Sequence, residues 1–221
     1  MPLTKTYSRV KSVKFADMTD EYLTLKGPGE GLFKDKGSKF FGYAFPVAEE
    51  EQIKRVLDEV RALHPKARHH CYAWRLGTEG ENYRSNDDGE PSGSAGKPIL
   101  NALLSAEITF ALVIVVRYFG GTLLGVPGLI HAYRESAAAA LSQAEKEVRT
   151  VDIPVRIDYD FDQTNVVMQV IKKMDLTVKG QFYEERSGLL LEVRKSYLPK
   201  IKEELRDFWR VKVSVPGQAE D

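Results

Sequence analysis

The sequence predicts a mixed α+β protein with two domains, and three observations lead to this fold class. The chain has 221 residues, more than one average domain but too few for two large ones. Segments with the alternation of strands are interspersed with segments that have the spacing of amphipathic helices. From Val148 onward the order is strand, helix, strand, strand, helix, strand, which is a ferredoxin-like βαββαβ unit of about 70 residues. The predicted domains therefore cover residues 1–147 and 148–221.

The first domain begins with strands that are followed by a helix. Residues 21–47 are predicted to be strands, because "EYLTL" alternates and "SKFFGYAFPV" is aromatic-rich and extended. Residues 48–64 predict a helix, since apolar residues recur at helical spacing and acidic residues occupy the first turn. Pro65 marks its end, and the next strand is expected at residues 69–76.

Two further helices and a buried strand complete the first domain. The segment "GKPILNALLSA" predicts a helix that Ser92 or Ser94 caps. Residues 108–116 are β-branched and do not alternate, which predicts a fully buried strand. The following helix is expected to start near Val126 or Pro127 and to run through the alanine-rich segment.

The second domain is predicted from six consecutive segments that alternate between strand and helix patterns. The strands are expected at residues 151–160, 175–185, 188–196 and 210–215, and the helices at residues 163–174 and 197–208.

Composition excludes several classes of protein. Lysine and arginine total 32, as do aspartate and glutamate, so non-specific binding to duplex DNA is not expected. The longest apolar run, residues 110–116, is too short to span a membrane. Cys71 is the only cysteine, so an intrachain disulfide cannot form. These features predict a cytoplasmic protein.

The stretch "SNDDGEPSGSAGKP", residues 85–98, resembles a phosphate loop. Its glycines allow close backbone approach, and it leads into a helix whose first N–H groups attract anions. It is not a Walker A loop, because Pro91 and Pro98 stand where that motif requires glycine and serine or threonine. The loop therefore predicts an anion site of another kind.

A second glycine-rich turn, "RYFGG", follows the buried strand at residues 117–121. Arg117 ends that strand, where its guanidinium could bind a phosphate or a carboxylate. In the alternative interpretation the glycines only make turns and Arg117 neutralises Asp87 or Asp88. The candidate ligand-binding residues are His70, Arg84, Asp87, Asp88, Glu90, Ser92, Gly93, Ser94, Gly96, Lys97, Arg117, Tyr118, Gly120 and Gly121.

The acidic residues of this loop have three interpretations. Asp87, Asp88 and Glu90 could hold Mg²⁺, which prefers carboxylates. The sequence "NDDG" also has strong turn chemistry of its own, and this interpretation is favoured. Crowded carboxylates could supply a general acid.

The run "HHC", residues 69–71, invites a metal interpretation that strand geometry disfavours. Alternation places His69 and Cys71 on one face and His70 on the other, leaving at most two close ligands for zinc. No metal and no cofactor is therefore predicted. A nucleophilic pair of Cys71 with a histidine stays open, although nothing indicates a residue to orient the base.

Three segments of the sequence, "HHCYAWRLG", "SNDDGEPSGSAGKP" and "VIVVRYFGGTLLGVPGLIHAY", together resemble the IMPACT family, known in bacteria as YigZ-like proteins. The resemblance implies an N-terminal domain like domain 2 of ribosomal protein S5 and a C-terminal domain like the last domain of elongation factor G. It implies a setting in translation by analogy of fold. Eukaryotic members regulate translation under amino-acid starvation.

The sequence leaves two functions from different classes. The first is a non-enzymatic, translation-associated regulatory protein that binds RNA, the ribosome or a translation factor through the glycine-rich anion-binding cleft. Tyr72, Trp74 and Tyr118 would be available to stack on bases, although they are also typical core residues. The second is an enzyme that acts on a small phosphorylated or acidic metabolite, with the carboxylates either as ligands of Mg²⁺ or as the acid.

Overall fold

The computed structural model describes residues 20–183 and 185–217, which form two compact units. Residues 21–149 make up the N-terminal unit, and Asp20 joins the residues from Thr150 onward in the C-terminal unit. Both units combine helices with sheets, so the mixed α+β class is confirmed. The end of the C-terminal tail, residues 218–221, lies outside the described residues.

A five-stranded antiparallel sheet forms the centre of the N-terminal unit. Its strands stand in the order β2-β3-β6-β4-β5. The predicted buried strand is the central one and is covered at every position except Tyr118, at its end. The strands are β2 (Gly29–Asp35), β3 (Ser38–Pro46), β4 (His69–Leu76), β5 (Asn82–Asn86) and β6 (Ala111–Tyr118).

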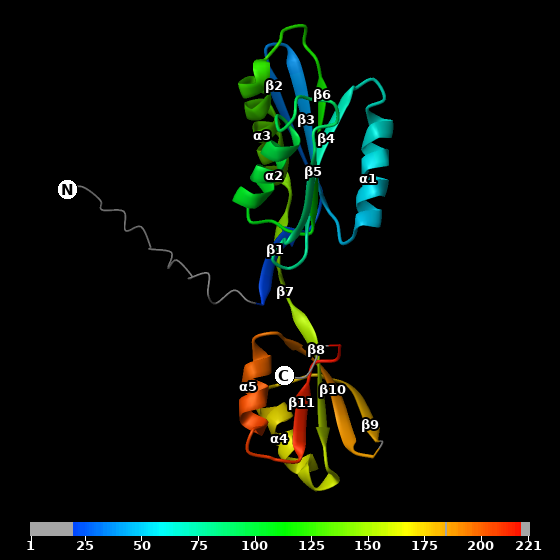
Figure 1. The fold of residues 1–221 in the computed structure, drawn as a ribbon, viewed down its shortest axis with the longest axis vertical. Helices are drawn as coiled ribbons and strands as arrows, with labels where there is room; N and C mark the ends of the chain where they lie inside the picture. The colour runs from blue at the N-terminus through cyan, green and yellow to red at the C-terminus, as the bar shows by residue number, and fades with distance from the viewer. Residues whose placement is uncertain (1–19, 184, 218–221) are drawn as a thin grey trace, which may run out of the picture. The chain divides into compact units, whose positions relative to one another are not determined.

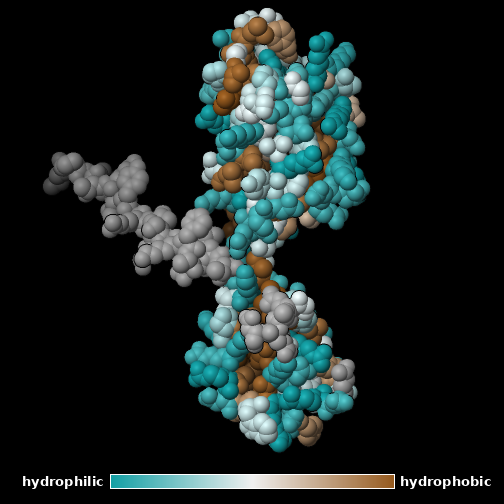
Figure 2. Space-filling model, viewed as in Figure 1, coloured by the Kyte–Doolittle hydropathy of each residue, from teal (hydrophilic) through white to brown (hydrophobic). Residues whose placement is uncertain are grey.

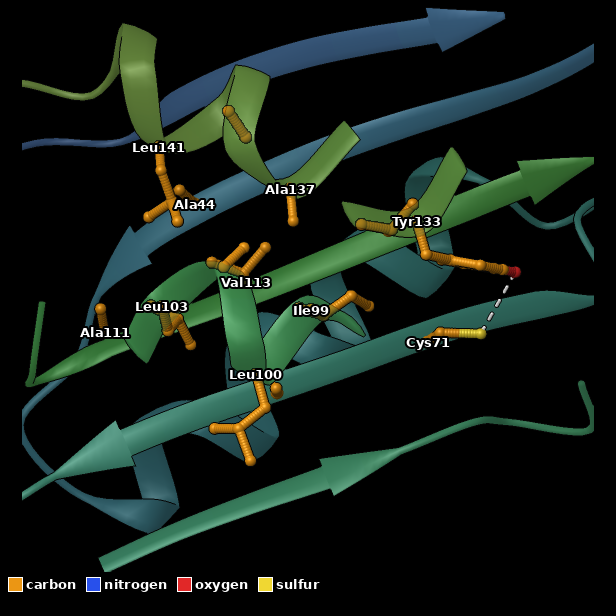
Figure 3. Packing of buried hydrophobic residues seen from close by; sticks show 14 of the residues in the cluster. Ala44, Cys71, Ile99, Leu100, Leu103, Ala111, Val113, Tyr133, Ala137 and Leu141 are labelled. Carbon is orange, nitrogen blue, oxygen red and sulfur yellow. Dashed lines mark hydrogen bonds between the residues drawn. The ribbon is translucent and has the colours of Figure 1, made fainter. Parts of the chain in front are cut away.

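Helices cover both faces of this sheet (Figure 1). Helix α1 (Glu50–Leu63) packs on one face, where its apolar stripe meets Trp74 and the even-numbered residues of β6. Helices α2 (Gly96–Ser105) and α3 (Gly125–Gln143) cover the other face (Figure 3). Among the described residues, no helix combines the length and apolar character needed to cross a membrane.

Helix α3 lies unusually close to the sheet because glycines line its path. A Cβ atom on Gly31 would stand 2.5 Å from the backbone nitrogen of Ala140, and one on Gly42 would overlap the carbonyl oxygen of Ser136. Side chains on these strands would therefore push the alanine-rich helix away from the sheet.

Two short strands of this unit were not predicted. Strand β5 is an exposed edge strand, and its sequence "NYRSN" has no apolar alternation. Strand β7 (Lys146–Thr150) follows α3 and pairs with β1 (Glu21–Leu25). Both are short and polar, so the apolar periodicity that identifies half-buried strands is missing.

The C-terminal unit contains two helices and a four-stranded sheet in the order β11-β8-β10-β9, with every pair antiparallel. One apolar cluster, which includes Ile157, Leu191 and Ile201, forms its core. Its elements are β8 (Asp152–Tyr159), a 3-10 turn (Phe161–Gln163), α4 (Thr164–Lys173), β9 (Val178–Tyr183), β10 (Ser187–Arg194), α5 (Tyr197–Leu205) and β11 (Val211–Ser214).

We predict that residues 148–221 fold independently, because the strands of this sheet pair only with one another and the unit has its own apolar core. The expected result for a fragment of these residues is a dispersed amide NMR spectrum. A collapsed spectrum, with the full chain dispersed under the same conditions, would contradict an independent domain.

Candidate functional site

Asp87 organises the glycine-rich loop. Its Oδ1 accepts hydrogen bonds from the backbone N–H groups of Ala95 (3.0 Å) and Gly96 (2.8 Å), and its Oδ2 accepts one from Gly93 (2.8 Å). The expectation of a serine cap on α2 is wrong, because no side chain at the cap position bonds the helix and Ser94 Oγ donates instead to Pro91 O. The carboxylate of Asp87 thus occupies the N–H groups that an external anion would use.

Asp88 fastens the same loop to strand β4. Its Oδ2 accepts a hydrogen bond of 2.6 Å from the backbone N–H of His70, and its carbonyl oxygen lies 2.9 Å from Nδ1 of His69. Its own N–H donates to Asn86 Oδ1, and its φ of 42° is left-handed. Asp87 and Asp88 therefore make the contacts expected of residues that shape a turn. The described residues contain no group of three or more histidine, cysteine or carboxylate side chains arranged for a metal ion.

Glu90 and Arg117 form a buried ion pair. Glu90 Oε1 accepts hydrogen bonds from Arg117 Nη1 (2.7 Å) and from the hydroxyl of Tyr133 (2.8 Å). The two charged side chains are only 4% and 9% exposed. The alternative that Arg117 neutralises Asp87 or Asp88 therefore names the wrong carboxylate. Tyr133 was not among the predicted site residues, although it is the last residue of the third motif; it lies on α3, 43 residues beyond Glu90.

Cys71 is part of the same buried network. Its Sγ lies 3.0 Å from the carbonyl oxygen of Asp87 and 3.3 Å from the hydroxyl of Tyr133 (Figure 3). Burial raises the pKa of the Cys71 thiol and also that of the Tyr133 hydroxyl. Because the thiolate is the nucleophile, we predict that this environment makes Cys71 slow to react.

We expect thiol reagents to label native Cys71 slowly at neutral pH, because the side chain is fully buried and its thiol stays protonated. Denaturant should restore the ordinary rate of a free thiol. Rapid labelling of the native protein would contradict this expectation and favour a nucleophilic role.

The histidines next to Cys71 do not form a catalytic pair with it. His70 lies on the opposite face of β4, and burial lowers its pKa even though the carboxylate of Asp88 is near. His69 shares the face of Cys71, but its Nδ1 bonds to Asp88 O. Among the described residues, Nε2 of His70 has no hydrogen-bond partner.

The other candidate residues divide between the rim of the loop and the second turn. Arg84, Ser92 and Lys97 are exposed. Gly93 and Gly121 have left-handed φ angles, which explains why glycine stands at these positions. Gly120 is needed for a different reason, since a Cβ atom there would overlap the backbone of the β2–β3 turn.

Sequence reasoning missed a cavity at the end of the sheet. Its volume is ≈ 380 Å³, and of the predicted residues only Tyr118 lines it. A signal was present in "SKFFGYAF", whose alternation places Lys39, Phe41 and Tyr43 on one face. The lining residues are Gly37, Lys39, Phe41, His64, Tyr118 and Phe119.

Comparison with known proteins identifies the family. The model of the Impact N-terminal domain matches residues 36–141, which contain the loop, the ion pair and the cavity. An IMPACT family member of Haemophilus influenzae is 32% identical over 189 residues, covering 85% of this chain and 92% of the relative. The chain belongs to the IMPACT family.

Further matches differ in how much of the chain they cover. The family member YigZ of Escherichia coli is 31% identical over 193 residues, or 86% of this chain and 95% of the relative. A crystal structure described as a hypothetical protein is 28% identical and covers 90% of this chain and 99% of its own, with a TM-score of 0.65. A yeast protein named as an IMPACT homolog matches only 41% of this chain and 36% of itself, at 35% identity.

Proposed function

We propose that this IMPACT protein is a non-enzymatic, translation-associated regulatory protein of the cytoplasm that binds RNA, the ribosome or a translation factor. Membership of the IMPACT family supports the setting in translation, which the resemblance of its three motifs implied. The observation that carries the binding role is the buried network around Glu90, in which Glu90 and Arg117 neutralise each other.

A network of this kind supports binding better than catalysis. The thiol of Cys71 is buried and protonated, and Asp87 is committed to three backbone N–H groups. A nucleophile or a general base needs an accessible atom at which a proton or a bond can move. A hydrogen-bonded scaffold instead holds the rim of the loop and the end of β6 in position for a partner.

The exposed rim of the loop is the part proposed to meet an acidic partner. Arg84 precedes the loop, Lys97 lies near its end, and both are exposed. A phosphate or carboxylate could approach these side chains without displacing Asp87 or breaking the buried ion pair. The anion would therefore bind at the exposed side chains of the rim, and not at the backbone N–H groups that Asp87 occupies.

We also propose a specific fold for each of the two units. The N-terminal unit is proposed to have the fold of domain 2 of ribosomal protein S5. The C-terminal unit is proposed to have the ferredoxin-like fold of the last domain of elongation factor G. The strand order β11-β8-β10-β9 supports the second assignment, because it is the order of a split βαβ unit.

Co-sedimentation with ribosomes at increasing salt tests the proposal. The wild-type protein should sediment with ribosomes at low salt and be released as salt rises. The double change Arg84→Ala and Lys97→Ala should weaken binding and lower the slope of log affinity against log salt by about 1.5, since two phosphate contacts are lost.

The matched control is Lys172→Ala with Lys202→Ala, which removes the same charge from exposed helix positions of the C-terminal unit. It should leave co-sedimentation unchanged. Absence of ribosome association at low salt, together with Mg²⁺-dependent thermal stabilisation by a sugar phosphate or nucleotide, would replace this proposal with the enzymatic alternative.

A further inference from the structure

The cavity at the end of the five-stranded sheet is open to solvent and has the volume of a small-ligand site. Its ≈ 380 Å³ falls within the usual range of about 300–1,000 Å³. Three separate segments line it: the β2–β3 hairpin with the start of β3, the residue that follows α1, and the end of β6. Three of its six lining residues are phenylalanine or tyrosine, namely Phe41, Tyr118 and Phe119.

The inner wall of the cavity is held rigidly by hydrogen bonds. Nε2 of His64 lies 2.7 Å from the hydroxyl of Tyr43, and its Nδ1 lies 3.0 Å from the hydroxyl of Tyr118. Burial lowers the pKa of His64, so at neutral pH one ring nitrogen donates and the other accepts. The ring of Phe41 packs against both neighbours, at 5.5 Å from His64 and 5.8 Å from Tyr118. The wall is therefore formed before any ligand arrives.

The outer wall presents an aromatic ring to solvent. Phe119 is 58% exposed, although the backbone beside it is fixed. The N–H of Gly120 donates to Ser38 Oγ at 3.1 Å, and the close approach of Gly120 to Gly37 locks the turn onto the hairpin. In Figure 2 the end of the unit that carries this turn shows hydrophobic surface beside hydrophilic surface. An exposed ring on a fixed backbone is ready to stack on a planar ligand.

The rim of the cavity is positively charged. Lys39 lies directly opposite Tyr118 on the neighbouring strand, and within the described chain it is the only lining residue with a permanent charge. Lys34 stands opposite Lys39 on β2, Lys36 lies at the hairpin turn, and all three lysines are exposed. The one carboxylate between them, Asp35, is half-buried. The rim therefore attracts an anionic group to the edge of the aromatic wall.

We propose that this cavity binds a nucleotide unit, with its base against Tyr118 and Phe119 and its phosphate at Lys39. Stacking requires an unpaired base, so the unit is either part of single-stranded RNA or a free nucleotide. An acidic peptide would satisfy the lysines but would add no planar group to the exposed ring of Phe119, which the Arg117 guanidinium already approaches to 5.6 Å from the ring centroid. The inference deepens the proposed function by naming the ligand chemistry, and it rests on that function only for the setting in translation.

Fluorescence anisotropy with the full-length protein tests the site, with short labelled oligouridylate and oligoadenylate as probes. Phe119→Ala should weaken binding by about 5- to 150-fold, which corresponds to the loss of one stacked base. Lys39→Ala should lower the slope of log affinity against log salt by about 0.7. Phe161→Ala, which removes an 83% exposed ring from the C-terminal unit, and Lys172→Ala are matched controls that should bind normally.

Competitors identify the source of the nucleotide. Displacement of the probe by uridine or adenosine monophosphate at similar concentration assigns the site to free nucleotides, and displacement by unlabelled single strands alone assigns it to RNA. Both results support the cavity. The proposal is overturned if neither probe binds at low salt, if Phe119→Ala binds normally, or if duplex RNA or a glutamate-rich peptide competes as well as a single strand.

Ribosome co-sedimentation of the wild-type protein separates the nucleotide site from the proposed function. If the probes fail to bind but the wild-type protein still sediments with ribosomes, the nucleotide site is rejected and the proposed function is retained. If ribosome association fails as well, and a sugar phosphate or nucleotide stabilises the protein in the presence of Mg²⁺, the enzymatic alternative replaces the proposed function.

Discussion

Glu90→Ala is expected to lower the free energy of unfolding by about 3–5 kcal/mol, because it leaves the buried guanidinium of Arg117 without its carboxylate. The same change removes the acceptor of the Tyr133 hydroxyl, so two buried donors lose a partner at once. Glu90→Gln should cost less, because its side-chain oxygen still accepts both hydrogen bonds. Urea unfolding followed by tryptophan fluorescence measures the difference, because Trp74 is buried in the same unit whereas Trp209 of the C-terminal unit is already 82% exposed.

A control within the same unit is Glu145→Ala. Glu145 also pairs with a cation, Lys26 at 2.6 Å, but both side chains are more than half exposed. Its removal should change stability little, because exposed ion pairs contribute little. Equal effects of Glu90→Ala and Glu145→Ala would show that the Glu90–Arg117 pair is not a buried structural contact.

Arg117→Lys separates a structural role from a ligand-binding role. Lysine keeps the positive charge but loses the planar fork of the guanidinium. If Arg117 is only the partner of Glu90, the variant should be less stable and should bind ribosomes normally. If Arg117 binds a ligand, losing one charge-assisted hydrogen bond should weaken affinity by roughly 10- to 150-fold.

The sequence was most informative where apolar residues follow a period. Strand β6 reads as an unbroken β-branched run because both of its faces are covered, by α1 and by α2 with α3. Helix α1 could also be predicted from the sequence, because the apolar stripe that faces the sheet recurs at helical spacing. Strands β5 and β7 have no buried face of that kind, so only the backbone pairing in the structure reveals them.

The candidate site was harder to predict because its chemistry depends on contacts between distant residues. The loop at residues 85–98 has the glycines and the helix start of an anion site, but Asp87 reaches across nine residues to Gly96. Glu90, rather than its more conspicuous neighbours, meets Arg117. Such pairings depend on how β6 and α3 approach the loop, and local residue patterns carry no information on that approach.

Gly42→Ala is expected to destabilise the N-terminal unit by about 3 kcal/mol, at the upper end of the usual cost of overpacking. The added methyl group would overlap the carbonyl oxygen of Ser136 and stand 2.9 Å from its Oγ. Rotation of a side chain cannot relieve a clash with the helix backbone, so α3 would have to move away from β3. Ser136 Oγ donates to Phe40 O, and this buried hydrogen bond would be strained by the same movement.

Gly27→Ala is the matched control, because it places the same methyl group where the described residues leave 4 Å of open space. It should be neutral or stabilise the protein by about 0.4–1 kcal/mol, since alanine restricts the unfolded chain more than glycine does. The contrast between the two variants in urea unfolding isolates the close packing of α3. A Gly42→Ala protein as stable as Gly27→Ala would mean that α3 shifts freely, and the fixed position of Tyr133 beside Glu90 and Cys71 would then need another explanation.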